Sequence, residues 1–154
     1  VAERAGVTWG VIQYHFGDRN GLLMAVVDDG VSQMVESLST ADVSELPLAE
    51  RVATVVDIAW DCYSSPTSRA ALEILQGMRN DLGPRRHLLE MNDAIGRLGL
   101  LISDDPADHD VAEVIWAALR GMVMAQMIMN EPLDWQRERR TLVEMAIQRL
   151  CCNG

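Results

Sequence analysis

Residues 1–23 read VAERAGVTWGVIQYHFGDRNGLL, and this stretch says most about what the chain does. Gly6 suits the left-handed turn that ends a helix, and Thr8 suits the N-cap of a new one. The sequence therefore predicts that one helix ends within residues 1–5 and that a short helix covers residues 9–15.

The predicted short helix has an apolar inner face and a more polar outer face. Ile12 and Phe16 are four residues apart and share the inner face. Gly10 costs about 1 kcal/mol relative to alanine inside a helix, a cost that makes sense if a phosphate must come close to the backbone. The outer face is predicted to hold Trp9, Gly10, Gln13 and Tyr14.

A helix, a glycine turn and a short second helix form the helix-turn-helix pattern, in which the second helix enters the major groove of DNA. Gly17 is expected to end the short helix, and Asp18 to cap a long helix beginning at Arg19. The free amides that follow Thr8 can meet phosphate oxygens.

The strings AERAGVT at 2–8, YHFG at 14–17 and GLL at 21–23 resemble the signature of TetR-family transcriptional regulators. The resemblance is close over about 23 residues, and elsewhere it extends only to helix number and order. The chain does not begin with Met and opens in what reads as the middle of a helix. We therefore expect an N-terminally truncated DNA-binding domain whose first helix is missing.

The resemblance implies a set of DNA contacts. Trp9 and Val11 would read base edges, Gly10 would pack against the DNA backbone, and Tyr14 and His15 would contact phosphates or bases. The full set of expected DNA-binding residues is Thr8, Trp9, Gly10, Val11, Gln13, Tyr14, His15 and Arg19.

Two of these positions differ from the family pattern. Arg19 stands where the family usually has a phosphate-binding Lys, and its guanidinium also suits phosphate oxygens. Gln13 stands where the family usually has Tyr. Because Gln can pair with adenine or bond a phosphate, the operator sequence stays open.

The charge distribution restricts where DNA can bind. The chain has 13 cationic residues, all Arg, and 23 acidic ones, for a net charge of −10. Residues 1–21 sum to zero, so residues 22–154 carry the whole excess. An acidic body repels phosphate, which leaves the N-terminal end to face DNA and requires positive charge from the missing segment. We expect residues 1–21 to be the partial helix-turn-helix domain and residues 22–154 a ligand-binding and dimerisation domain.

The rest of the chain predicts an all-α fold. Each proline precedes a helix-like stretch, as expected for a residue tolerated in the first turn, and Ser65 and Asp105 are placed to cap two of them. Apolar stripes at helical spacing indicate core faces, for example Val52, Val55, Val56, Ala59 and Tyr63. Helices are expected near 19–39, 47–64, 66–80, 84–102, 107–130 and 134–151.

The last two predicted helices carry more apolar surface than one core face needs. The helix over 107–130 is apolar nearly all round, which predicts burial on several sides. The helix over 134–151 shows two stripes, one for the core and one for a partner chain. These stripes are Leu142, Met145 and Arg149, and Val143, Ile147 and Leu150.

The resemblance implies a homodimer through 107–130 and 134–151, and a ligand cavity whose occupation tilts the long helix after Asp18. The expected function is a cytoplasmic, nucleoid-associated repressor, not an enzyme, released from double-stranded operator DNA by a small, largely apolar molecule. No cofactor, metal or membrane is expected to take part.

Several large side chains either line that cavity or form ordinary core: Trp60, Tyr63, Met91, Trp116, Met124 and Met127. Arg120 lies in an apolar stretch and, if buried, needs a partner. That partner is either a ligand carboxylate or an internal acid such as Asp57 or Glu73.

Two alternatives remain at this stage. A di-iron enzyme would need Glu-x-x-His pairs, whereas His87 precedes Glu90 and no second pair exists. A helical dimerisation module without operator binding is the other. The cysteines, Cys62, Cys151 and Cys152, show no zinc spacing and suit reduced thiols, and Val114–Met129 is short for a membrane span.

Overall fold

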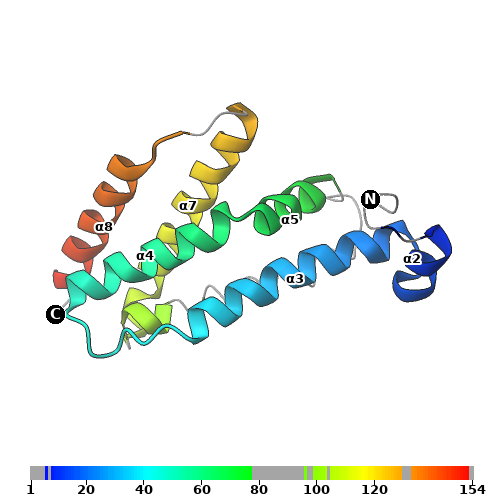
Figure 1. Ribbon diagram of the computed structural model, residues 1–154. Coiled ribbons are helices and arrows are strands. Elements are labelled where there is room, and N and C mark those ends of the chain that lie inside the picture. Colours follow the sequence, from blue (N-terminus) through cyan, green and yellow to red (C-terminus); the bar gives the residue numbers. More distant parts are fainter. Residues whose placement is uncertain are drawn as a thin grey trace.

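The chain folds into α-helices (Figure 1). The computed structural model describes residues 6, 8–77, 96, 99–103, 105–129 and 133–152. These residues contain no β-strand, so the all-α prediction is confirmed for them. The elements are α2 (Trp9–Phe16), α3 (Arg19–Ser39), α4 (Leu48–Ser64), α5 (Pro66–Gly77), the 3₁₀ turn η1 (Pro106–Asp108), α7 (His109–Met129) and α8 (Gln136–Cys151).

Most helix boundaries fall within one or two residues of the prediction. The helix predicted over 9–15 extends to Phe16, and the one predicted from 107 begins as η1 before continuing as α7. Of the helix predicted over 84–102, only Gly96 and residues 99–102 are described as helical. The remainder of that prediction, Met91 included, lies outside the described residues.

Side-chain caps are present at three of the predicted positions, Asp18, Ser65 and Asp105. Asp18 Oδ1 accepts a hydrogen bond from the Gly21 amide at 2.8 Å, and Ser65 Oγ accepts one from the Ser68 amide at 3.2 Å. Asp105 Oδ1 accepts a hydrogen bond from the Ala107 amide at 2.8 Å, in the turn η1 that precedes α7. These bonds satisfy amides that have no partner within the helix, each worth about 1 kcal/mol.

Helix α4 lies at the centre and contacts α3, α5, α7 and α8. Figure 1 shows α3 running along one side of it, with α2 beyond the far end of α3, and α7 and α8 on the other side. The predicted stripe on α4 is fully buried and supplies the middle of the core. That stripe is Val52, Val55, Val56, Ala59 and Tyr63.

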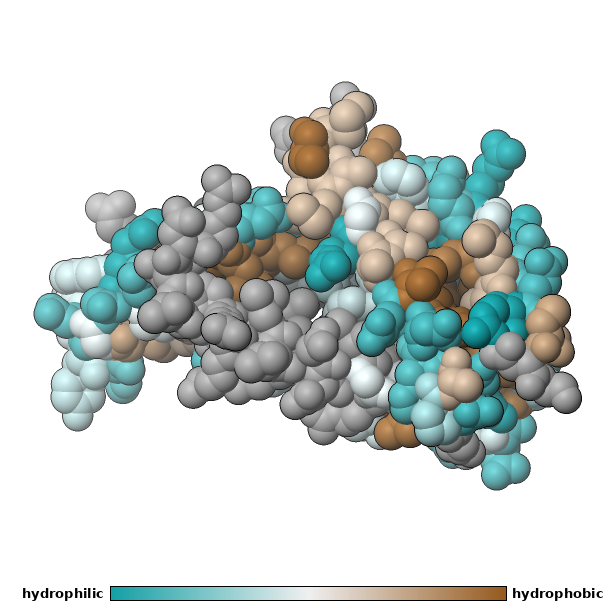
Figure 2. All heavy atoms as spheres, turned by 180° about the vertical axis from the view of Figure 1, so that it is seen from behind, coloured by the Kyte–Doolittle hydropathy of each residue, from teal (hydrophilic) through white to brown (hydrophobic). Residues whose placement is uncertain are grey.

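The prediction that the helix over 107–130 is buried on several sides is wrong for the single chain. One face of α7 is buried, from Val111 to Val123, where it packs against α4 and α8. The opposite face is exposed although it is apolar, and Ile128 there is 80% exposed. Figure 2 shows apolar side chains over the projecting end of this helix. The exposed apolar and small residues of this face, the α7 stripe, are Val114, Ala117, Gly121 and Ile128.

The prediction of which residues form the core face of α8 is also wrong in part. The core face consists of Leu142, Ala146 and Leu150, which are four residues apart. Met145 and Arg149, predicted to continue the Leu142 stripe, are exposed instead. Spacings of three and four both fit a helix of 3.6 residues per turn, and the small Ala146 side chain lets α8 pack closely on the core.

One helical segment, Pro106–Met129, is long and apolar enough to cross a membrane by length and composition. It is longer than the Val114–Met129 stretch that the sequence singles out. Its buried face packs against other helices in the core, as described for α7.

Candidate functional site

The short helix α2 lies at the outer end of α3, away from the body of the molecule (Figure 1). Among the described helices its main contacts are with α3. Ile12 is its single buried residue and anchors it. The prediction of a shared buried face holds only for Ile12, because Phe16 is 40% exposed.

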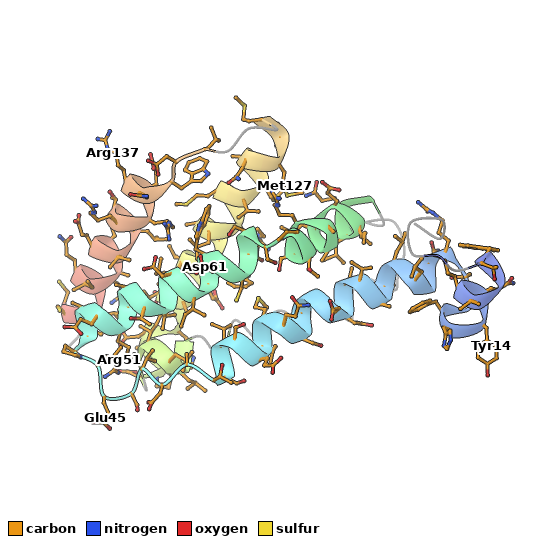
Figure 3. The ribbon with its side chains drawn as sticks, viewed as in Figure 1. Tyr14, Glu45, Arg51, Asp61, Met127 and Arg137 are labelled. Atoms are coloured by element: carbon orange, nitrogen blue, oxygen red, sulfur yellow. The ribbon has the colours of Figure 1, made fainter. Side chains whose placement is uncertain are left out.

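The outer face of α2 is open to solvent. Trp9 is 52% exposed and Tyr14 is 86% exposed, and Val11, Gln13 and His15 are exposed as well. Figure 3 shows the Tyr14 side chain pointing away from the molecule. A helix that presents two large aromatic side chains to water has a surface suited to contact with another molecule.

The start of α2 leaves its first amides free of a side-chain cap. Thr8 has the extended backbone of an N-cap residue, as predicted, but its hydroxyl makes no capping hydrogen bond. A Cβ added at Gly10 would meet only Thr8 Oγ1, at 3.8 Å. Packing inside the described chain therefore gives no reason for a glycine at position 10.

The turn between α2 and α3 depends on two glycines. Gly17 has a φ of +76° and ends α2 as predicted. Gly21, in the first turn of α3, lies directly against the Phe16 carbonyl oxygen, so that a Cβ there would collide with it. Together with the Asp18 cap, this contact fixes the angle between the two helices.

The described part of this end carries one guanidinium, that of Arg19, and one carboxylate, that of Asp18. Arg19, the expected phosphate contact, is exposed at the start of α3. Asp18 is held by the Gly21 amide, and α2 itself contains no carboxylate.

A second candidate site lies in the core, where Tyr63 on α4 meets Trp116 on α7. Their rings contact edge to face with centroids 4.3 Å apart, and both side chains are buried. The Tyr63 hydroxyl and Trp116 Nε1 are buried without a hydrogen-bond partner in the described part of the chain. Burial raises the pKa of Tyr63 well above its usual value, and Arg120 partly offsets this. The tyrosine is therefore a neutral donor.

Beside Tyr63 is a small apolar cavity of about 30 Å³ between α3, α4 and α5. This volume holds roughly one water molecule. A Cβ added at Gly30 would lie 3.4 Å from the Cβ of Ala71, so α3 and α5 approach closely at this point. The sequence prediction missed this wall, which consists of Val27, Gly30, Val31, Met34, Ser68, Ala71, Leu72 and Leu75.

Of the side chains predicted to line a ligand cavity, only Tyr63 lines this one. Trp116 does not line the cavity but packs edge to face on the Tyr63 ring. Met124 and Met127 are half-buried on α7. Trp60 faces α8, where the Arg139 guanidinium lies 5.0 Å above its ring.

The predicted internal partners of Arg120 are not its partners. Asp57 binds Arg139 instead, with Nη1 2.7 Å from Oδ1, and Glu73 is exposed. Arg120 is only half-buried, so solvent relieves part of the desolvation cost that motivated the prediction.

Replacing Tyr63 with phenylalanine is expected to raise the free energy of unfolding by about 1 kcal/mol, because the variant keeps the ring contact and removes an unsatisfied buried hydroxyl. Urea denaturation measures the change. Tyr14→Phe is the matched control, since that hydroxyl is in water. A loss of stability in Tyr63→Phe would show that the hydroxyl is bonded in solution.

Within the described ranges no group of three or more His, Cys, Asp or Glu side chains could hold a metal ion. Cys62 is half-buried, and Cys151 and Cys152 are exposed thiols. His87 and Glu90 lie outside the described residues.

Comparison with known proteins gives no match. No family model, no curated protein and no solved structure is significantly similar to the chain. Interpretation of both candidate sites therefore rests on their own residues and geometry.

Proposed function

We propose that the chain is a ligand-responsive, DNA-binding transcriptional regulator of the TetR type, with α2 as its recognition helix. The observation that carries the proposal is the exposed outer face of α2, held at the end of α3 by Ile12 and the Gly21 turn. A recognition helix must offer its side chains to the major groove without obstruction.

The base-reading surface in this proposal consists of Trp9, Val11 and Gln13, with Tyr14 and His15 beside it. Gly10 supports it indirectly, because the glycine costs helix stability and is not required by the described packing. Thr8 leaves the first amides of α2 available for a phosphate oxygen, and Arg19 adds a guanidinium nearby.

The proposed ligand is a small, largely apolar molecule that enters beside Tyr63 and releases the protein from DNA. The cavity there is apolar, and Tyr63 brings to it a buried donor that has no acceptor among the described residues. A ligand with an oxygen acceptor at one end would satisfy such donors. Since the observed cavity holds about one water, ligand binding requires α3 and α5 to separate.

The proposed homodimer uses α7 and α8, with the protein in the cytoplasm at the nucleoid. The α7 stripe supports this, because apolar side chains in a row on a helix favour contact with a second surface. The same observation favours the alternative of a helical dimerisation module without operator binding.

A DNA-binding measurement separates these functions. The protein expressed from its native gene, mixed with the DNA upstream of that gene, should bind with an affinity that falls as salt rises. Gln13→Ala should weaken binding about tenfold, as expected for loss of one base contact. Fluorescence anisotropy over a series of salt concentrations measures the salt dependence, and the same measurement at one fixed salt concentration compares Gln13→Ala with the parent protein.

Gln76→Ala is the matched control, because Gln76 is exposed on α5 and does not belong to the α2 surface. Equal binding of Gln13→Ala and Gln76→Ala would remove α2 as the reading helix. Absence of any specific binding, with a dimer in sedimentation, would favour the dimerisation module.

A further inference from the structure

A groove between α4 and α8 lies apart from both sites discussed above. Its volume of about 280 Å³ approaches that of small-molecule pockets. Ala53, Val56 and Val143 give it an apolar floor, and polar side chains form its rim. The rim consists of Asp57 from α4 and Gln136, Arg139 and Arg140 from α8.

Arg139 is held rigidly in this groove. Its Nη1 donates to Asp57 Oδ1 at 2.7 Å, and its guanidinium stacks over Trp60. Only 20% of the side chain is exposed. Its Nε is buried and meets no acceptor among the described residues, and the same holds for Trp135 Nε1 at the start of α8.

The balance of charge at the rim is positive. Asp57 neutralises Arg139, which leaves Arg140 exposed without a carboxylate partner in the described ranges. Gln136, the first residue of α8, lies where the helix dipole also favours an anion, and Arg140 follows one turn later. The groove therefore offers a positive charge beside an apolar floor in a chain with a net charge of −10.

We propose that this groove binds a small carboxylate with an apolar body. The carboxylate of the ligand contacts the Arg140 guanidinium and the side-chain amide of Gln136. The apolar body of the ligand lies on Ala53, Val56 and Val143. A guanidinium suits a carboxylate because it offers two parallel N–H donors. This site is separate from the Tyr63 cavity and does not depend on DNA binding.

The test uses 4-fluorobenzoate as the probe and its ¹⁹F NMR line width as the readout of binding to the native protein. Arg140→Gln is expected to weaken binding about fivefold, as for loss of a partly exposed charged contact. Arg137→Gln is the matched control. It removes the same charge from the same turn, and Figure 3 shows Arg137 pointing away from the molecule. That variant should bind the probe like the parent protein.

A second variant tests the groove itself. Ala53→Phe fills the apolar floor and should abolish binding of the probe, with circular dichroism to check that the helices remain. Equal affinity of the Arg140→Gln and Arg137→Gln variants would overturn the proposal, because the probe would then bind elsewhere. Equally strong binding of 4-fluorobenzyl alcohol, or displacement of the probe by an equal concentration of inorganic phosphate, would also overturn it, since neither compound has both a carboxylate and an apolar body.

Discussion

Replacing Gly21 with alanine is expected to lower the free energy of unfolding by about 3 kcal/mol, near the upper end of the usual cost of forcing a group into a packed site. The added Cβ would collide with the Phe16 carbonyl oxygen. A backbone atom cannot rotate aside as a side chain can, so α2 must move relative to α3. Urea denaturation measures the stability, and amide NMR shifts of residues 9–16 report the displacement of α2.

Gly10→Ala is the control for this experiment, because the same change there meets only ordinary contact. Helix propensity predicts that it stabilises the protein by up to about 1 kcal/mol. Under the proposed function it nevertheless weakens operator binding, since the new methyl group faces the DNA backbone. If Gly21→Ala left both the unfolding midpoint and the α2 shifts unchanged, the described turn would be incorrect.

Replacing Trp116 with alanine is expected to cost about 3–5 kcal/mol, the usual range for deleting a large aromatic side chain from a core. Trp116 is among the largest fully buried side chains and packs edge to face on Tyr63. Its removal leaves a cavity between α4 and α7 that the neighbouring side chains cannot fill. Thermal and urea unfolding both measure the loss.

The matched control is Trp9→Ala, which removes the same side chain from the exposed face of α2. Because Trp9 is 52% exposed, this change should cost far less, on the order of 0.5 kcal/mol. Similar losses of stability in the two variants would contradict the assignment of Trp116 to the core and Trp9 to the surface.

The elements that local rules determine could be predicted from the sequence. The α4 stripe follows from helical periodicity, and the caps at Asp18, Ser65 and Asp105 follow from the hydrogen-bonding needs of helix ends. The exposed outer face of α2 could be predicted because Ile12 and Phe16, four residues apart, mark an inner face, although the structure buries only Ile12.

Features that depend on distant parts of the chain could not be predicted in this way. The Arg139–Asp57 ion pair joins residues that are 82 positions apart in the sequence. No local sequence pattern predicts this pair. The cavity wall was missed because residues such as Gly30 and Ala71 are small and carry no chemical signature. The exposure of the α7 stripe could not be predicted, because periodicity shows that the helix over 107–130 is apolar nearly all round and not what covers each face.

The close approach of Gly30 to Ala71 has a mechanical consequence. A Cβ added at Gly30 would make ordinary contact with the Ala71 side chain, so we take this point as the fulcrum for a rotation of α3 as a rigid rod. About 11 residues, or roughly 16 Å of helix, separate it from the end that carries α2. A rotation of about 10° about the fulcrum therefore displaces α2 by about 3 Å, which is large against the tolerance of a hydrogen bond.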